Sequence, residues 1–131
     1  MKKNLDIIKS ILERFVQADT PFIPFEELDP RNPDVFLEDP EFVTNLLLVF
    51  EGGLISNRKG ETTPFSALGL EMYSWGNGWH SQDLRLTDQG HELADALSKK
   101  PIFDKLKAQA SNLSMALLIE VSKTMLVKAI S

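Results

Sequence analysis

The stretch LRLTDQGHELADAL, residues 84–97, predicts a short strand that runs directly into a helix. The strand ends at Thr87, which is suited to cap the helix, and Gly90 lies in the first helical turn. A capping threonine followed by a small residue lets a strand and a helix pack at a tight angle. We therefore expect a strand that returns to a helical core just before the next helix departs.

Upstream of this joint the sequence predicts two helices separated by a proline-rich segment. Residues 3–17 carry an apolar stripe with helical spacing, and Asn4 is a candidate cap. Residues 20–36 contain four prolines and predict an ordered loop or short strand and turns. Residues 40–51 follow a candidate cap at Asp39 and are apolar around most of the circumference, so this helix is expected to be largely buried, with Leu46 and Leu47 in the core.

Between the second helix and the joint, the sequence predicts a strand that begins at residues 54–56 and then a loop over 57–69 with the character of a mobile segment. Residues 70–75 and 79–86 predict the two arms of a hairpin, with Gly76, Asn77 and Gly78 supplying the turn. Beyond the joint, residues 101–110 and 113–130 predict two more helices.

This order of elements is typical of a winged helix, in which a small antiparallel sheet flanks a helical core. We therefore predict an α+β, mainly helical fold of winged helix-turn-helix type with an added C-terminal helical tail. Residues 1–98 are expected to form the core. Residues 99–131 are expected to form a helical extension, packed on the core or in a dimer interface, so that the chain is a single domain overall.

The segments NLDIIKSILERF, FVTNLLLVFEGGLIS, RLTDQGHELADAL and PIFDKLKAQASNLSMALLIEVSKTML together resemble a family of bacterial and prophage proteins of unknown function. That family has an N-terminal "DLIR-ILL" helix, a helix ending "LL–AGLI", and "RLTW-GH-FLDA" before a helical tail. Gly52, Asp88 and Ala94 depart from this pattern. The resemblance implies a winged-helix fold and a phage or mobile-element setting, and it supplies no catalytic residues.

Composition restricts the chemistry. The chain has no cysteine, which excludes disulfides, thiol catalysis and cysteine-ligated metals. Asp6 and Lys9 interrupt the N-terminal segment, so no signal peptide is expected, and Glu120, Lys123 and Lys128 interrupt the longest apolar stretch, so no membrane span is expected. A cytoplasmic setting is the default. His91 and Asp95 have the i, i+4 spacing of two metal ligands, but nothing nearby completes a site, and a packed or capping histidine is the simpler interpretation. We predict no enzyme, no cofactor and no metal.

The charge pattern bears on DNA binding, which the expected fold suggests. Residues 1–51 carry 5 basic and 11 acidic side chains, a net of −6, and eight carboxylates lie between Asp19 and Glu41. This segment is either a solvated loop or an acidic surface for a basic partner. Contacts with the phosphate backbone require basic residues, and the expected recognition helix at 40–51 has none. A DNA-binding regulator, the alternative function, would depend on Asn45 to read an adenine edge and on Arg58, Lys59 and Arg85 to contact phosphate.

We therefore predict a non-enzymatic module that binds an unidentified protein, for which the sequence offers two surfaces. Aromatic anchors are common in binding hot spots, and the hairpin carries the candidate contacts Tyr73, Trp75, Trp79 and His80. The alternative for both tryptophans is that they close the core. The last helix carries more apolar residues than one stripe needs, so we also predict a possible homodimer. Its candidate contacts are Leu113, Leu117, Leu118, Val121 and Met125.

Overall fold

A computed structural model describes residues 2–130, and it begins with the predicted N-terminal helix. Helix α1 spans Leu5–Val16. The side chain of Asn4 caps it by accepting the amide of Asp6 at 3.0 Å. The apolar stripe of α1 faces inward, and Ile8, Ile11 and Leu12 are fully buried.

The proline-rich segment forms short ordered elements, as the sequence predicts. Strand β1 (Ile23–Pro24) leads into a 3-10 turn, η1 (Phe25–Glu27), and then into the one-turn helix α2 (Pro33–Phe36). The rings of Phe25 and Phe36 lie 5.9 Å apart inside the core. These aromatic side chains attach the segment to the helices.

Helix α3 spans Pro40–Glu51 and has the predicted cap, because the Asp39 carboxylate accepts the amide of Phe42 at 3.2 Å. Leu46 is fully buried, as expected. The expectation that Leu47 lies in the core is wrong, because this side chain is only partly buried and packs against the core from outside. A helix that is apolar on most sides gives no periodic signal that separates these two neighbours.

Protonation of Asp39 should weaken the fold at acid pH. Its carboxylate accepts a hydrogen bond from Arg31 at 3.0 Å and caps α3, and these bonds hold its pKa below the usual value. A depressed carboxyl pKa gives stability that is present above pH 4 or so and is lost as pH falls through the folded-state pKa. We expect Asp39→Asn, which keeps a capping group, to lower the unfolding free energy at pH 7 by less than about 1 kcal/mol. Urea unfolding from pH 7 to 3 should show the difference from wild type shrinking. A constant difference would contradict this prediction.

The strands pair differently from the predicted hairpin. Strand β5 (Asp83–Leu86) lies between β1 and β2 (Ile55–Asn57) in an antiparallel sheet of order β1-β5-β2. Strands β3 (Leu70–Tyr73) and β4 (Gly76–Trp79) form a separate two-stranded sheet. The predicted second arm over 79–86 therefore divides, because residues 83–86 pair with β1 and β2, and the local sequence does not specify this pairing.

The segment over residues 57–69, predicted as a mobile loop, has an organised centre. The buried side chain of Asn57 accepts the amides of Lys59 and Glu61, both at 3.0 Å, and donates to Glu61 and to the Ala67 carbonyl. A short 3-10 turn, η2 (Phe65–Leu68), follows and buries Leu68. One asparagine thus uses its full hydrogen-bonding capacity to fold this loop.

The joint at residues 84–90 has the predicted tight geometry. The Thr87 hydroxyl caps helix α4 (Asp88–Ser98) by accepting the amide of Gly90 at 3.1 Å, and it donates to the Gly53 carbonyl at 2.8 Å. A Cβ atom at Gly90 would lie 2.1 Å from the Leu54 carbonyl oxygen. Only glycine allows the start of α4 to lie this close to the segment that follows α3.

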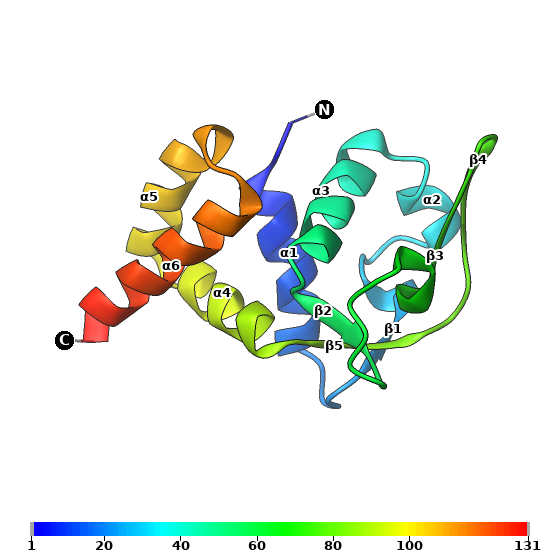
Figure 1. Ribbon diagram of the computed structural model, residues 1–131, viewed down its shortest axis with the longest axis horizontal. Helices are drawn as coiled ribbons and strands as arrows, with labels where there is room; N and C mark the ends of the chain where they lie inside the picture. The colour runs from blue at the N-terminus through cyan, green and yellow to red at the C-terminus, as the bar shows by residue number, and fades with distance from the viewer. Residues whose placement is uncertain (1, 131) are drawn as a thin grey trace.

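The tail consists of α5 (Lys100–Gln109), a 3-10 turn η3 (Ala110–Asn112) and α6 (Met115–Ile130). Helix α6 packs mainly on α4 and also contacts α5 and α3 (Figure 1). Lys3 links the N-terminal segment to this tail by donating to the carbonyls of Ala110 and Leu113. One cluster of buried hydrophobic side chains extends from α1 to α6. No helix within residues 2–130 has the length and apolar character to cross a membrane.

Candidate functional site

The β3–β4 hairpin has one face toward the core and one away from it. Leu70 pairs with Trp79, and both point inward. The Trp79 ring stacks on Phe25 at 6.1 Å with an interplanar angle of 9°, and its indole N–H donates to Asp34 of α2 at 3.1 Å. Trp79 therefore anchors the hairpin on η1 and α2.

Two aromatic side chains lie at the tip of the hairpin. The rings of Tyr73 and Trp75 stack with centroids 4.8 Å apart and an interplanar angle of 3°. Trp75 is 82% exposed and Tyr73 48% exposed, in contrast to the anchored Trp79. The predicted aromatic cluster therefore divides into an anchor at the base and an exposed pair at the tip.

Gly76 and Gly78 of the stretch WGNGW, residues 75–79, do not form the predicted hairpin turn. The turn consists of Ser74 and Trp75, while Gly76 and Gly78 lie in β4. A Cβ at Gly78 would lie 3.2 Å from the Tyr73 ring. The glycine therefore lets this ring lie flat against the strand. Alternate glycines in a strand share one face, so the GxG spacing is the signal that could have revealed this surface.

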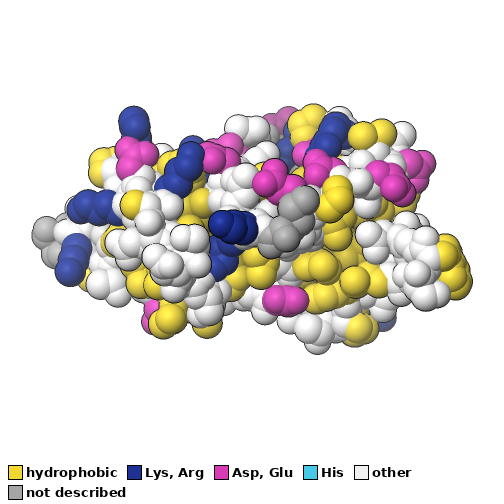
Figure 2. Space-filling model, turned by 90° about the horizontal axis from the view of Figure 1, so that it is seen from above, with side chains coloured by type: hydrophobic (Ala, Val, Ile, Leu, Met, Phe, Trp, Pro, Cys, Tyr) yellow, Lys and Arg dark blue, Asp and Glu magenta, His cyan; other side chains and the backbone are white. Residues whose placement is uncertain are grey.

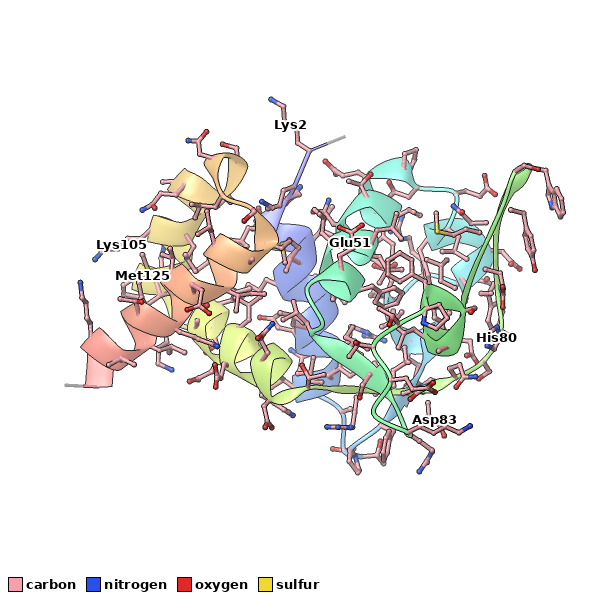
Figure 3. All side chains as sticks on the ribbon, viewed as in Figure 1. Lys2, Glu51, His80, Asp83, Lys105 and Met125 are labelled. Carbon is pink, nitrogen blue, oxygen red and sulfur yellow. The ribbon has the colours of Figure 1, made fainter. Side chains whose placement is uncertain are left out.

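The base of the hairpin is held by close backbone contacts. The His80 amide donates to the Gly69 carbonyl at 2.9 Å, and its ring Nδ1 lies 3.0 Å from Glu71 (Figure 3). Gly69 has φ +100°, and a Cβ there would lie 2.7 Å from the His80 carbonyl oxygen. His80, a candidate partner contact, thus lies at the base of the hairpin, away from the exposed tip.

An acidic surface adjoins the hairpin. Arg31, the one basic residue of the segment from Asp19 to Glu41, lies 2.6 Å from Asp29 and 3.0 Å from Asp39. Hydrogen bonds to these two carboxylates raise its pKa. On the face seen in Figure 2, magenta side chains are more numerous in the half that holds α2 and the hairpin, and dark-blue ones in the half that holds α5 and α6. The outermost edge at the hairpin end is white and yellow. The acidic segment therefore reaches the base of the hairpin, where Asp34 accepts the indole N–H of Trp79.

The prediction that Asn45 could read a base edge is wrong. Its side chain is fully buried, accepts the Asn4 amide at 2.7 Å, and donates to the carbonyls of Lys2 and Glu41. It therefore fastens the N-terminal segment to α3. An asparagine in an apolar helix looks like a surface residue because its long-range partners do not appear in the local pattern.

The three cations predicted to touch phosphate do not form a basic patch. Arg58 lies 2.8 Å from Asp83 and 4.2 Å from the centroid of the Phe22 ring, and Arg85 donates to the Leu86 carbonyl at 3.2 Å. Lys59 is exposed. Arg58 and Lys59 share a cavity of about 480 Å³ with Glu61 and Asp83. Two carboxylates therefore offset the two cations there.

The exposed apolar strip along α6, the predicted dimer surface, contains fewer residues than predicted. Leu118, a candidate dimer contact, is fully buried against the chain's own core. Leu117 is 54% exposed, while Leu113, Val121 and Met125 are partly buried. Helix α6 packs on α4 as well as on α5. These two helices together bury more of the apolar side chains of α6 than α5 alone could. Met125 also lines a groove of about 280 Å³ between α5 and α6, near Lys105 (Figure 3).

A dimer through the remaining strip of Leu117, Val121 and Met125 stays a prediction. Sedimentation at micromolar concentration should show a species of about twice 14.7 kDa, and Leu117→Lys should convert it to monomer by placing a charge in the contact. A single species of 14.7 kDa for the wild-type protein would contradict this prediction.

His91 and Asp95 have the spacing of two metal ligands on one face of α4. Both residues are exposed, and Asp95 lies 2.9 Å from Lys99. Among residues 2–130, no three histidine or carboxylate side chains lie close enough together to hold an ion.

Comparisons with protein-family models, curated proteins and solved structures find no match for this chain. The family resemblance of the four segments therefore stays a prediction.

Proposed function

We propose that the protein is a non-enzymatic interaction module with a winged-helix fold, and that it binds another protein through the tip of the β3–β4 hairpin. The element order α1-β1-α2-α3-β2, hairpin, β5 and the strand order β1-β5-β2 support the winged helix. The hairpin then occupies the place of the wing. The family resemblance adds a phage or mobile-element setting, so the partner would be a host or phage protein in the cytoplasm.

The exposed pair of Tyr73 and Trp75 is the observation that carries this proposal. Tryptophan and tyrosine dominate binding hot spots, and contacts held in place before binding lose less entropy on association. The stack, the glycine at position 78 and the anchored Trp79 hold the pair in one arrangement. A tryptophan that is 82% exposed adds little to the stability of its own fold.

Affinity capture from the native host tests this proposal. We expect wild-type protein to retain a partner that the double variant Tyr73→Ser, Trp75→Ser loses, with about a tenfold or greater fall in affinity. Val16→Ser is the matched control, because Val16 is 59% exposed but lies on α1. Equal unfolding free energies should accompany the loss. Retention of the same partner by the double variant would contradict the proposal.

The residues of α3 disfavour DNA binding. Its sequence, PEFVTNLLLVFE, contains two glutamates and no basic residue, and its one asparagine is buried. We expect fluorescence anisotropy with mixed duplex DNA at low salt to show no tight binding. Tight binding that weakens steeply with added salt would support the alternative, a DNA-binding regulator.

A further inference from the structure

We infer that the outer face of Trp75 receives an arginine guanidinium of the partner, so that the partner presents a basic, arginine-containing segment to the hairpin tip. The inference is carried by a stacked aromatic pair on a hairpin whose base packs on the acidic segment, through the bond of Trp79 to Asp34. It rests on the proposed function and specifies the chemistry of the partner at the same site.

The geometry leaves one aromatic face open. Tyr73 covers one side of the Trp75 ring at 4.8 Å, and Tyr73 itself lies against Gly78. Trp75 keeps 82% of its surface exposed, so its other face is accessible to a planar group. The molecule already uses this contact internally, since Arg58 lies 4.2 Å from the centroid of the Phe22 ring.

The chain's own arginines are bonded elsewhere. Arg14 donates to the Glu27 carbonyl and Arg85 to the Leu86 carbonyl, while Arg31 and Arg58 donate to carboxylates. The guanidinium for Trp75 is therefore expected from another protein.

Charge determines which planar group fits. A nucleic-acid base would bring phosphates toward a segment with eight carboxylates and one arginine, and Asp34 of that segment is bonded to the base of the hairpin. A cation is attracted by the same carboxylates and by the electron-rich face of the indole. Arginine fits better than lysine, because its planar guanidinium stacks on aromatic rings and is more weakly hydrated.

The probes are two peptides of equal length and charge, one with alternating glycine and arginine and one with alternating glycine and lysine. In NMR titrations of the full chain, the indole N–H signal of Trp75 is identified by its loss in Trp75→Ser. We expect the arginine peptide to shift this signal saturably and to bind about 2- to 5-fold more tightly than the lysine peptide. Trp75→Ser, followed through its backbone amides, should bind the arginine peptide about 2- to 5-fold more weakly. Val16→Ser should match wild type.

Several results would overturn the inference. Equal binding of both peptides, or unchanged binding by Trp75→Ser, would mean that charge alone attracts them. Tighter binding of an oligothymidylate would assign the ring to a base, and a Trp75 shift with protein concentration alone would assign it to a second copy. If neither peptide binds at Trp75 while the double variant still loses its captured partner, the guanidinium assignment is wrong and the proposed interaction module is retained. If capture is also unaffected, both fall.

Discussion

Replacing Gly90 with alanine should destabilise the protein by about 3 kcal/mol, although alanine in a helix ordinarily stabilises by about 1 kcal/mol relative to glycine. The added Cβ would lie 2.1 Å from the Leu54 carbonyl oxygen, and a backbone oxygen cannot turn aside as a flexible side chain can. The start of α4 must then move away from this carbonyl. That movement strains the bonds of Thr87 to Gly90 and Gly53.

Gly52→Ala is the matched control for this prediction. Gly52 has φ −73°, and a Cβ there would meet its nearest atoms at 3.4 Å, an ordinary contact. We expect its unfolding free energy to stay within about 0.5 kcal/mol of wild type, as for a site without strain. Urea unfolding of both variants provides the measurement. If Gly90→Ala were as stable as Gly52→Ala, that result would contradict the claim that residue 90 lies too close to the Leu54 carbonyl for a side chain.

Leu46→Ala should cost about 2–5 kcal/mol, because it removes a fully buried side chain of α3 and leaves a cavity in the core. Leu47→Ala makes the same chemical change one position along the helix, where the side chain is partly exposed. It should cost clearly less, about 1 kcal/mol. Thermal or urea unfolding followed by circular dichroism would compare them. Equal losses would contradict the burial difference and would place both leucines in the core.

The sequence predicts the parts of the fold that depend on neighbours along the chain. The caps at Asn4, Asp39 and Thr87 and the five long helices follow from local chemistry and helical spacing, and the structure confirms them. The placement of β5 between β1 and β2 does not follow from local chemistry, because the strands that pair with β5 lie about 30 and 60 residues away along the chain.

The candidate site is predictable to the same extent. The aromatic cluster around WGNGW is visible in the sequence, but its division is not. Trp79 becomes an anchor through Asp34, 45 residues earlier, and through stacking on Phe25. Asn45 likewise becomes a structural residue through Asn4. Local patterns carry no information about such distant partners, so exposure at these positions requires the three-dimensional structure.

Photo-crosslinking from position 75 in the native host tests the central claim most directly. A benzophenone-bearing phenylalanine in place of Trp75 should attach to a protein, and the adduct should resist nuclease and be absent when the same residue replaces Val16. The exposed position of Trp75, 82% accessible, makes this replacement compatible with the fold. A nuclease-sensitive adduct, or the same adducts from both positions, would contradict a protein partner at the hairpin tip.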